Sequence, residues 1–192
     1  YQFQNANSAL YLEVKDASAE AGANVQQWGA NGNDCQNWTL KEFGDGYYYI
    51  LSRLGDGKTY YLDVAEGKGD DGTNIQIFTN TKTSAQLFKF IPNPDGTYYI
   101  VTRASKDKGA LGVAAASKEQ GANVLQWTKN GSMDQMWNIT AIGAIPTPVT
   151  TTEPPVVTTE APTETTTATP VLTTEAPTET TTAAPVLTTE AP

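Results

Sequence analysis

The sequence predicts an all-β protein built from three structural repeats of about 49 residues. One element, Leu12-Glu13-Val14, returns as Leu62-Asp63-Val64 and as Leu111-Gly112-Val113, spaced 50 and then 49 residues apart. Apolar and polar residues alternate over short stretches bounded by Gly, Asn and Asp, which is typical of strands. No window of eleven or more residues has a helical period. About four short strands in each of three equal repeats favour a closed β-trefoil with pseudo-threefold symmetry over a propeller or a solenoid.

The second repeat illustrates the expected strands in order. The first, near 48–53, is rich in Tyr and Ile and follows the turn sequence Gly44-Asp45-Gly46. The second, near 60–64, ends on the Leu-Asp-Val element, and the third, near 74–78, ends on an aromatic residue. The fourth, near 86–91, alternates apolar and polar residues before a Pro-Asp-Gly turn.

The third predicted strand of every repeat carries a small residue, Asn, a β-branched residue, two further positions and an aromatic residue. The three copies are Ala23-Asn24-Val25-Gln26-Gln27-Trp28, Thr73-Asn74-Ile75-Gln76-Ile77-Phe78 and Ala122-Asn123-Val124-Leu125-Gln126-Trp127. If the β-branched residue faces the core, strand alternation turns this first aromatic outward, together with the residue two positions before it. A β-bulge would invert the assignment.

A second aromatic follows ten residues later in each repeat and is preceded by a Gln. These second aromatics, Trp38, Phe88 and Trp137, are predicted core residues because every repeat keeps a large ring there. The first aromatics are either ligand platforms or residues that pack in the core or between repeats. The Gln residues, Gln36, Gln86 and Gln135, either satisfy buried backbone groups at the repeat junctions or contact a ligand. Asp63, between two apolar residues, is expected to point to solvent.

Charge and composition exclude several functions. Of the net charge of −9, the last 47 residues contribute six Glu, which leaves 12 Lys and Arg against 15 Asp and Glu in the remainder, or −3. A nearly balanced domain without a basic cluster gives no footprint for nucleic acid or an anionic membrane, and no apolar run approaches a membrane span. The chain has one Cys, no His and no catalytic, phosphate-binding or metal-ligating motif. We therefore expect no enzyme activity, no cofactor and no metal.

The chain divides by composition near residue 144. Residues 1–143 are predicted to form the β-trefoil, and 144–192 to form an extended, disordered linker of Thr, Pro and Glu in fifteen-residue units. The chain opens directly on a predicted strand, Tyr1-Gln2-Phe3, which favours a module of a longer processed protein.

The spacing of Gln26-Gln27-Trp28 and Gln36-Asn37-Trp38 resembles the repeat of ricin-type lectin domains, the family 13 carbohydrate-binding modules. The resemblance covers residues 1 to about 142 and recurs in three registers. The family is a β-trefoil with a shallow sugar pocket on each repeat, in which an acid and amides bind hydroxyls and an aromatic stacks on the ring. The tail resembles linkers of secreted, multi-modular enzymes that degrade plant polysaccharides.

The resemblance implies candidate carbohydrate-binding residues in each repeat. The first supplies Glu13, Gln26, Trp28 and Gln36; the second supplies Asp63, Gln76, Phe78 and Gln86; the third supplies Trp127, Asp134 and Gln135. Glu13 is one methylene longer than the usual Asp. Gly112 and Leu125 replace the expected acid and amide, so we expect the third repeat to be the weakest or repurposed.

The expected function is that of a non-catalytic, monomeric carbohydrate-binding module in a secreted, extracellular protein. It would target an attached catalytic or docking module, for example of a glycoside hydrolase, to a plant cell-wall polysaccharide. Xylan, arabinoxylan and galactose-containing glycans are the candidate ligands. The alternative is a protein-binding or structural β-trefoil without sugar sites. An exposed acid beside an exposed amide, as predicted for Asp63 with Gln76 and for Glu13 with Gln26, would favour the first interpretation.

Overall fold

The computed structural model describes residues 1–143 and confirms the all-β prediction. The predicted linker, 144–192, lies outside the described residues. The strands are β1 (Gln2–Asn5), β2 (Tyr11–Val14), β3 (Val25–Trp28), β4 (Trp38–Gly44), β5 (Tyr47–Ser52), β6 (Tyr60–Val64), β7 (Thr73–Thr79), β8 (Phe88–Pro92), β9 (Tyr98–Thr102), β10 (Gly109–Val113), β11 (Val124–Thr128) and β12 (Met136–Thr140).

Six short 3₁₀ turns join the strands, two in each repeat. They are η1 (Lys15–Ala17), η2 (Asp34–Gln36), η3 (Ala65–Gly67), η4 (Ser84–Gln86), η5 (Ala114–Ala116) and η6 (Met133–Gln135). The repeat pattern of the sequence does not predict these turns. In the second repeat the fourth strand was expected near 86–91 but begins at Phe88, because Gln86 ends η4 and its side chain is used elsewhere.

Six strands close into an antiparallel barrel. The ladder passes from β4 to β5, β8, β9, β12 and β1. The ring closes just before β1, where the Tyr1 amino group donates to Trp38 O at 2.6 Å and Trp38 N donates to Tyr1 O at 2.9 Å. Closure leaves the barrel without an unpaired edge.

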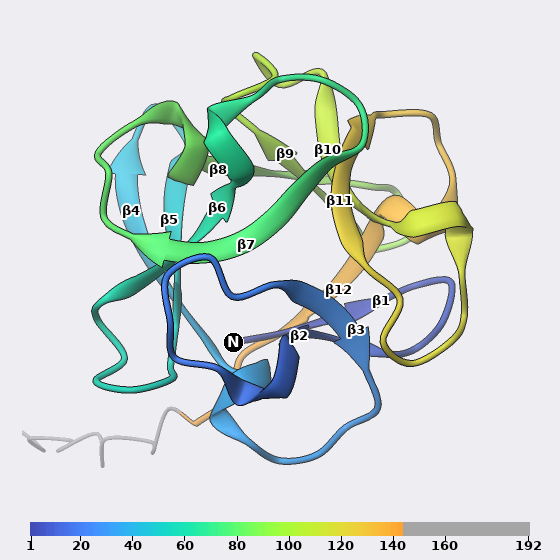
Figure 1. Ribbon diagram of the computed structural model, residues 1–192. Coiled ribbons are helices and arrows are strands. Elements are labelled where there is room, and N and C mark those ends of the chain that lie inside the picture. Colours follow the sequence, from blue (N-terminus) through green and yellow to red (C-terminus); the bar gives the residue numbers. More distant parts are fainter. Residues whose placement is uncertain (144–192) are drawn as a thin grey trace, which may run out of the picture. The chain divides into compact units, whose positions relative to one another are not determined.

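The other six strands form three hairpins, β2–β3, β6–β7 and β10–β11, which Figure 1 shows arranged around the centre of the view. Asn24, Asn74 and Asn123 meet there in a closed ring of hydrogen bonds. Asn24 Nδ2 donates to Asn123 Oδ1 at 2.9 Å, Asn123 Nδ2 donates to Asn74 Oδ1 at 2.8 Å, and Asn74 Nδ2 donates to Asn24 Oδ1 at 2.9 Å. The ring lies on the pseudo-threefold axis and ties the three hairpins together.

The core is built from the same positions of each repeat. Leu12, Leu62 and Leu111 are fully buried, as is the Val or Ile that follows the ring Asn in each repeat. The second aromatics, Trp38, Phe88 and Trp137, are at most 1% exposed, which confirms their prediction as core residues. The two indoles donate to the carbonyls of Leu12 and Leu111, so their polar atoms are satisfied inside the core.

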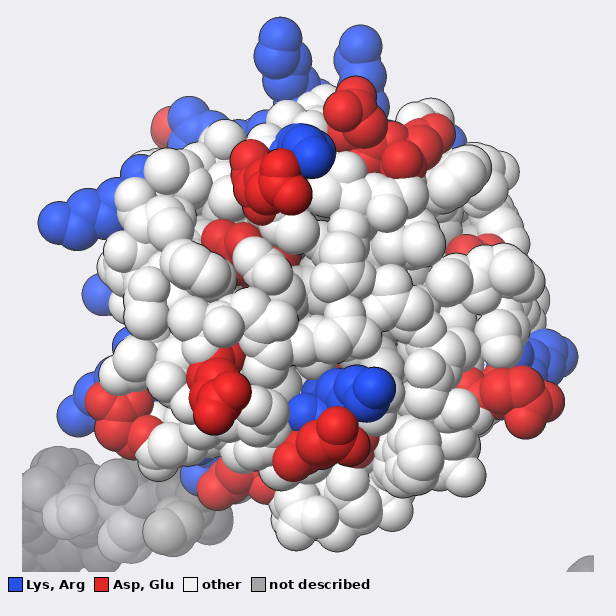
Figure 2. All heavy atoms as spheres, viewed as in Figure 1, with Lys and Arg blue, Asp and Glu red and all other residues white. Residues whose placement is uncertain are grey.

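Charges are scattered over the face seen in Figure 2, where Lys and Arg alternate with Asp and Glu and neither sign forms a continuous patch. Three ion pairs occur among residues 1–143, the closest of them between exposed Lys68 and Glu66 at 2.7 Å. Over the same residues, no helix is long and apolar enough to cross a membrane. Nor do these residues bring three or more His, Cys, Asp or Glu together as metal ligands would require.

Candidate functional site

The second repeat places an acid beside an amide on hairpin β6–β7. Asp63 and Gln76 are directly opposite in the ladder, and Gln76 Nε2 donates to Asp63 Oδ1 at 3.0 Å. Leu62 and Val64, the neighbours of Asp63, are fully buried in the core. Strand alternation therefore turns the Asp63 carboxylate to the other face of the hairpin, away from the core.

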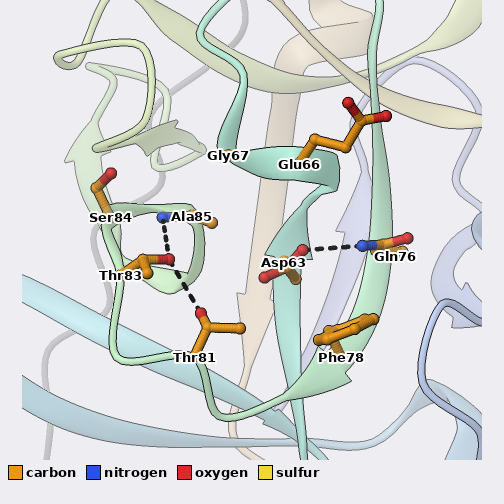
Figure 3. Close-up of a pocket in the computed structure, with 9 residues that line it drawn as sticks. All are labelled: Asp63, Glu66, Gly67, Gln76, Phe78, Thr81, Thr83, Ser84 and Ala85. Carbon is orange, nitrogen blue, oxygen red and sulfur yellow. Dashed lines mark hydrogen bonds between the residues drawn. The ribbon is translucent and has the colours of Figure 1, made fainter.

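Asp63 does not point freely into solvent as the sequence analysis expected, because its side chain is only 4% exposed. The turn η3 and the loop after β7 rise around it. Figure 3 shows Asp63 between the Thr81–Ala85 loop on one side and Gln76 and Phe78 on the other. Together these residues line a hollow of about 500 Å³, and Asp63 is part of its lining. We call it the second site; it is lined by Asp63, Glu66, Gly67, Gln76, Phe78, Thr81, Thr83, Ser84 and Ala85.

The Asp63 carboxylate is less occupied than its hydrogen-bonding capacity allows, although the Gln86 amide lies close enough to influence it. Within the described residues, the side-chain hydrogen bond that Asp63 receives within 3.5 Å is the one from Gln76 to Oδ1. Burial raises the pKa of the Asp63 carboxyl above its ordinary value, while the amides of Gln76 and Gln86 act in the opposite direction. A partly desolvated carboxylate with an unused lone-pair face is a strong acceptor for ligand hydroxyls.

The equivalent hollow of the first repeat, the first site, is smaller, about 230 Å³, and its acid is already occupied. Glu13 Oε1 accepts from Gln26 Nε2 at 3.0 Å. Glu13 Oε2 accepts from Asn31 Nδ2 at 2.7 Å and from Gln36 Nε2 at 2.9 Å. Glu13 and Gln26 are each only 5% exposed and Asp63 only 4%, so neither repeat has the exposed acid beside an exposed amide that the sequence predicted. The extra methylene of Glu13 brings its carboxylate within reach of these amides.

Cys35 forms part of the wall of the first site. Burial raises the pKa of its thiol, and the nearby Glu13 carboxylate adds to this effect against the opposing hydrogen bond from Asn31. The thiol is therefore protonated at neutral pH and forms a small apolar part of the lining of the first site.

The equivalent hollow of the third repeat, the third site, has no acid on its strands. Gly112 and Leu125 are opposite each other where the other repeats have the acid–amide pair. Trp127 stands beside this apolar floor, and Asp134 approaches from η6. The third site measures about 290 Å³ and is lined by Val113, Ala115, Ala116, Leu125, Trp127, Asn130, Ser132, Asp134 and Gln135.

The first aromatic of each repeat faces outward, which confirms the orientation predicted from strand alternation. Trp28 is 39% exposed and Trp127 is 45% exposed, whereas Phe78 is partly exposed within its hollow. Each lines the hollow of its own repeat. Packing inside the core is thereby excluded for these aromatics. The two Trp rings do lie against a neighbouring repeat, with Trp28 Cζ3 3.4 Å from the Cβ position of Gly121 and Trp127 Cζ3 3.7 Å from that of Gly72.

The Gln before each second aromatic clamps the loop that follows the first aromatic. Gln86 Nε2 donates to Thr79 O at 2.8 Å, and its Oε1 accepts from Thr81 N at 2.9 Å. Gln36 and Gln135 make the matching pair of bonds in the other repeats. All three are at most 1% exposed. The structure thus shows the backbone-satisfying role; a direct contact of these residues with a ligand stays a prediction.

Sequence reasoning missed the residue three positions after the first aromatic. Asn31, Thr81 and Asn130 occupy this position, and their backbone N–H groups bind the clamping Gln in the same way. Asn31 additionally reaches the acid of its own site. The only signal was the regular spacing after the first aromatic, since nothing local marks a contact with a residue eighteen positions earlier.

A β-trefoil with one hollow per repeat, each walled by an outward aromatic, is a class of domain that offers up to three shallow sites. Three overlapping segments, 1–78, 55–127 and 84–149, match the family described as ricin-type β-trefoil lectin domain-like. These segments together span most of the 192-residue chain, so the protein belongs to this lectin-like family.

Two solved structures are similar in both sequence and fold. A designed threefold-symmetric protein, ThreeFoil, is 34% identical with a TM-score of 0.70, covering 74% of this chain and 98% of that one. An exo-β-1,3-galactanase from Clostridium thermocellum is 32% identical with a TM-score of 0.69, covering 74% of this chain and 30% of that one. The ricin B-like lectin of Macrolepiota procera, solved with lactose, is 16% identical with a TM-score of 0.60 and shows the shared fold.

Among curated proteins, the α subunit of clotting factor G from Tachypleus tridentatus is 44% identical over 50 residues. This match covers 26% of the present chain and 7% of that subunit. The similarity therefore concerns about one repeat, and the chain spans a small part of that relative.

Proposed function

We propose that the protein is a non-catalytic carbohydrate-binding module whose principal binding site is the second site. The observation that carries the proposal is the second site itself. An acid that accepts one hydrogen bond within 3.5 Å, an adjacent amide and a partly exposed aromatic surround one open hollow. A pyranose has an apolar face of C–H groups and a rim of hydroxyls. Phe78 suits the face, and Asp63 with Gln76 suits a pair of neighbouring hydroxyls.

We propose a galactose-containing plant cell-wall glycan as the ligand, in preference to xylan or arabinoxylan. The support is the 32% identity to a β-1,3-galactanase and, at fold level, the lectins solved with lactose and with GalNAc. Neutral sugars also fit a face without a single-sign patch.

The role proposed for the module is to concentrate an attached partner on its polysaccharide. The match to this chain covers 30% of the galactanase, which offers a precedent for such a domain within a longer enzyme. We propose that residues 144–192 link the module to a catalytic or docking module in a secreted, extracellular protein, with the module itself monomeric. A shallow site binds weakly on its own, and more than one site on a rigid trefoil raises avidity for a polymer.

The test is affinity gel electrophoresis of the full chain against soluble β-1,3-galactan, xylan and arabinoxylan. Retardation by galactan is expected to be strongest, and Asp63→Ala is expected to weaken it by roughly tenfold or more, since hydrogen bonds to a charged group are lost. Glu20→Ala is the matched control, because this exposed acid lines none of the three hollows. Retardation by no glycan at all would overturn the proposal in favour of a protein-binding or structural trefoil.

A further inference from the structure

The hairpin β4–β5 carries an exposed aromatic cluster that lines none of the three hollows. Phe43 lies where the ladder from β4 to β5 shifts register, and its side chain is 48% exposed. The ring of Phe43 meets the ring of Tyr49 edge-on, with centroids 5.6 Å apart. Tyr49 in turn meets the buried Tyr61 edge-on at 5.4 Å. The exposed Phe43 ring is therefore held in place by a second ring that is anchored on the body of the domain.

Tyr47 extends this aromatic surface and has polar partners of its own. The hydroxyl group of Tyr47 lies 2.7 Å from Asp107 Oδ1 and 2.8 Å from Asp107 Oδ2, and donates to this carboxylate. Lys89 Nζ lies 4.2 Å from the centroid of the Tyr47 ring and 3.4 Å from Asp107 Oδ2. The charge of Asp107 is thus matched by Lys89, and the Tyr47 ring is fixed by both.

Arg103 lies against these rings and has no acid of its own. Its Cζ atom is 4.9 Å from the centroid of the Tyr47 ring and 5.7 Å from that of Phe43. None of the three ion pairs among residues 1–143 includes Arg103, and its guanidinium donates no hydrogen bond within 3.5 Å to any of these residues. A guanidinium stacked on aromatic rings keeps its N–H groups at its edge, where a planar carboxylate accepts two of them.

The pseudo-threefold relation provides an internal comparison for Arg103. Arg53 occupies the equivalent position one repeat earlier, and both arginines donate their backbone N–H to the residue that follows a clamping Gln. Arg53 pairs with Asp34 on η2 at 3.7 Å. On η4 the residue equivalent to Asp34 is Ser84, which carries no charge. The fold therefore accommodates a paired Arg at this position, and the chain leaves Arg103 without that partner beside an exposed aromatic ring.

We propose that Arg103 and Phe43 form a fourth site, which binds the carboxylate and the ring of a hexuronic acid residue in an acidic glycan. A hexuronate supplies a planar carboxylate for the guanidinium and an apolar C–H face for the exposed phenyl ring. The turn that begins at Arg103 also contains Lys106 and Lys108, so three of the twelve cations of the chain lie within six residues and attract an anionic ligand. This inference goes beyond the neutral glycan proposed for the second site and uses none of its residues.

The chain contains two Arg, so each guanidinium can be observed separately. The full ¹⁵N-labelled chain is titrated with sodium glucuronate and with sodium galacturonate at constant ionic strength, and the two Arg Nε–H signals are assigned with Arg53→Lys. The Arg103 signal is expected to shift with a uronate, while the signal of the paired Arg53 stays in place. Sodium acetate and inorganic phosphate have no sugar ring, so the same shift should require roughly fivefold higher concentrations of either.

Three variants separate the guanidinium from the ring. In Arg103→Gln, the backbone N–H signals of the turn 103–108 are expected to need at least tenfold more uronate, because hydrogen bonds to a charged group are lost. In Phe43→Ala, the uronate concentration that shifts the Arg103 signal should rise to that of acetate. Arg53→Gln is the matched control and should leave the response of the turn unchanged. Unshifted Trp38 and Trp137 indole signals in the ligand-free variants establish that the core is intact.

The outcomes distinguish this inference from the proposed function. Equal shifts of the two Arg signals, equal responses to uronate and to acetate or phosphate, or no response to either uronate would each overturn the fourth site. Retardation by galactan depends on Asp63 and should be retained in Arg103→Gln, so these results leave the second site standing. A uronate response of Arg103 without retardation by any neutral glycan would overturn the second site alone.

Discussion

A single methylene separates the occupied acid of the first site from the available acid of the second. Glu13 accepts three amide hydrogen bonds from its own repeat, one of them from Asn31 on the loop after β3. Asp63 is shorter, and the residue equivalent to Asn31 is Thr81, whose hydroxyl bonds to Thr83 instead. Asn31 thus uses an acceptor position of Glu13 that the second site leaves without such a donor.

Removing Asn31 is expected to open the first site. In Asn31→Ala the Oε2 atom of Glu13 keeps only the Gln36 donor and can accept from a ligand. In an NMR titration of the ¹⁵N-labelled chain with lactose, we expect the Trp28 indole N–H signal not to shift in the wild type. The same signal should shift in Asn31→Ala. Asn33→Ala serves as the control, since its side chain makes no contact with Glu13 among the bonds described here. An unresponsive Trp28 in Asn31→Ala would contradict the occupied-acid explanation.

Asp63 gives the second site a defined pH dependence. Because burial raises its pKa in the folded protein, the folded state binds a proton more readily than the unfolded state. The contribution of Asp63 to the free energy of unfolding therefore falls as the pH rises from the ordinary carboxyl value of about 3.9 through the raised value. Sugar binding has the opposite trend, because protonation removes the acceptor as the pH falls through the raised value.

The comparison of the wild type with Asp63→Asn measures both effects. Thermal unfolding is followed between about pH 3.5 and 7. The loss of stability that Asp63 causes as the pH rises should be seen in the wild type and be missing in Asp63→Asn. Asp63→Asn is therefore expected to be the more stable protein at neutral pH. Galactan binding by the wild type should weaken at the acidic end of this range. Identical pH profiles of unfolding in the two proteins would exclude an elevated Asp63 pKa.

At the scale of elements, the hairpins are joined by unequal contacts. Gln126 on β11 is fully buried, donates to the carbonyls of Lys68 and Asp70 at 3.2 and 3.0 Å, and accepts from the Thr102 hydroxyl. Gln27 on β3 makes the matching bonds to Ser117 and Glu119 in the third repeat. The equivalent residue of the second repeat is Ile77, which is buried and apolar. Two junctions are therefore polar clamps and one is a hydrophobic contact.

Replacing Gln126 with Leu is expected to destabilise the protein by about 1–3 kcal/mol, because the backbone carbonyls of Lys68 and Asp70 lose their shared donor. Urea unfolding measures the change. Ile77→Leu, an apolar exchange at the equivalent position, should cost less than about 1.5 kcal/mol. Equal stability of Gln126→Leu and the wild type would show that the clamp contributes nothing to the junction.

At the scale of the whole molecule, the Asn ring on the pseudo-threefold axis makes the three hairpins interdependent. Asn74 takes part in two of the three hydrogen bonds of the ring, as donor to Asn24 and as acceptor from Asn123. Contacts that join residues 49 to 99 positions apart stabilise the closed fold rather than any single repeat.

Asn74→Ala is accordingly expected to lower the free energy of unfolding by about 1–3 kcal/mol. Asn138→Ala is the control on the exposed face of β12, where the side chain belongs to no ring. Hydrogen exchange should accelerate in all three hairpins of Asn74→Ala rather than in β6–β7 alone. Acceleration confined to that one hairpin would contradict the role of the ring in coupling the repeats.

The amino-acid sequence by itself determined the number of repeats, the strand-based architecture and the sorting of the aromatics. These follow from local order: a 49-residue period and a strand period of two decide that Trp28 faces out and that Trp38 faces in. Strand alternation likewise turned Asp63 from the core. Strand alternation does not predict that Asp63 is buried, because the loop that covers Asp63 comes from residues about twenty positions later in the chain.

Only the tertiary structure decided which sites are open. Whether Glu13 is available depends on the reach of Asn31, and the third hollow has a carboxylate only because the fold brings Asp134 of η6 into its lining. Both are contacts across a folded pocket, where tenths of an ångström separate a hydrogen bond or a clash from empty space. A linear pattern records which residues recur, but not these distances.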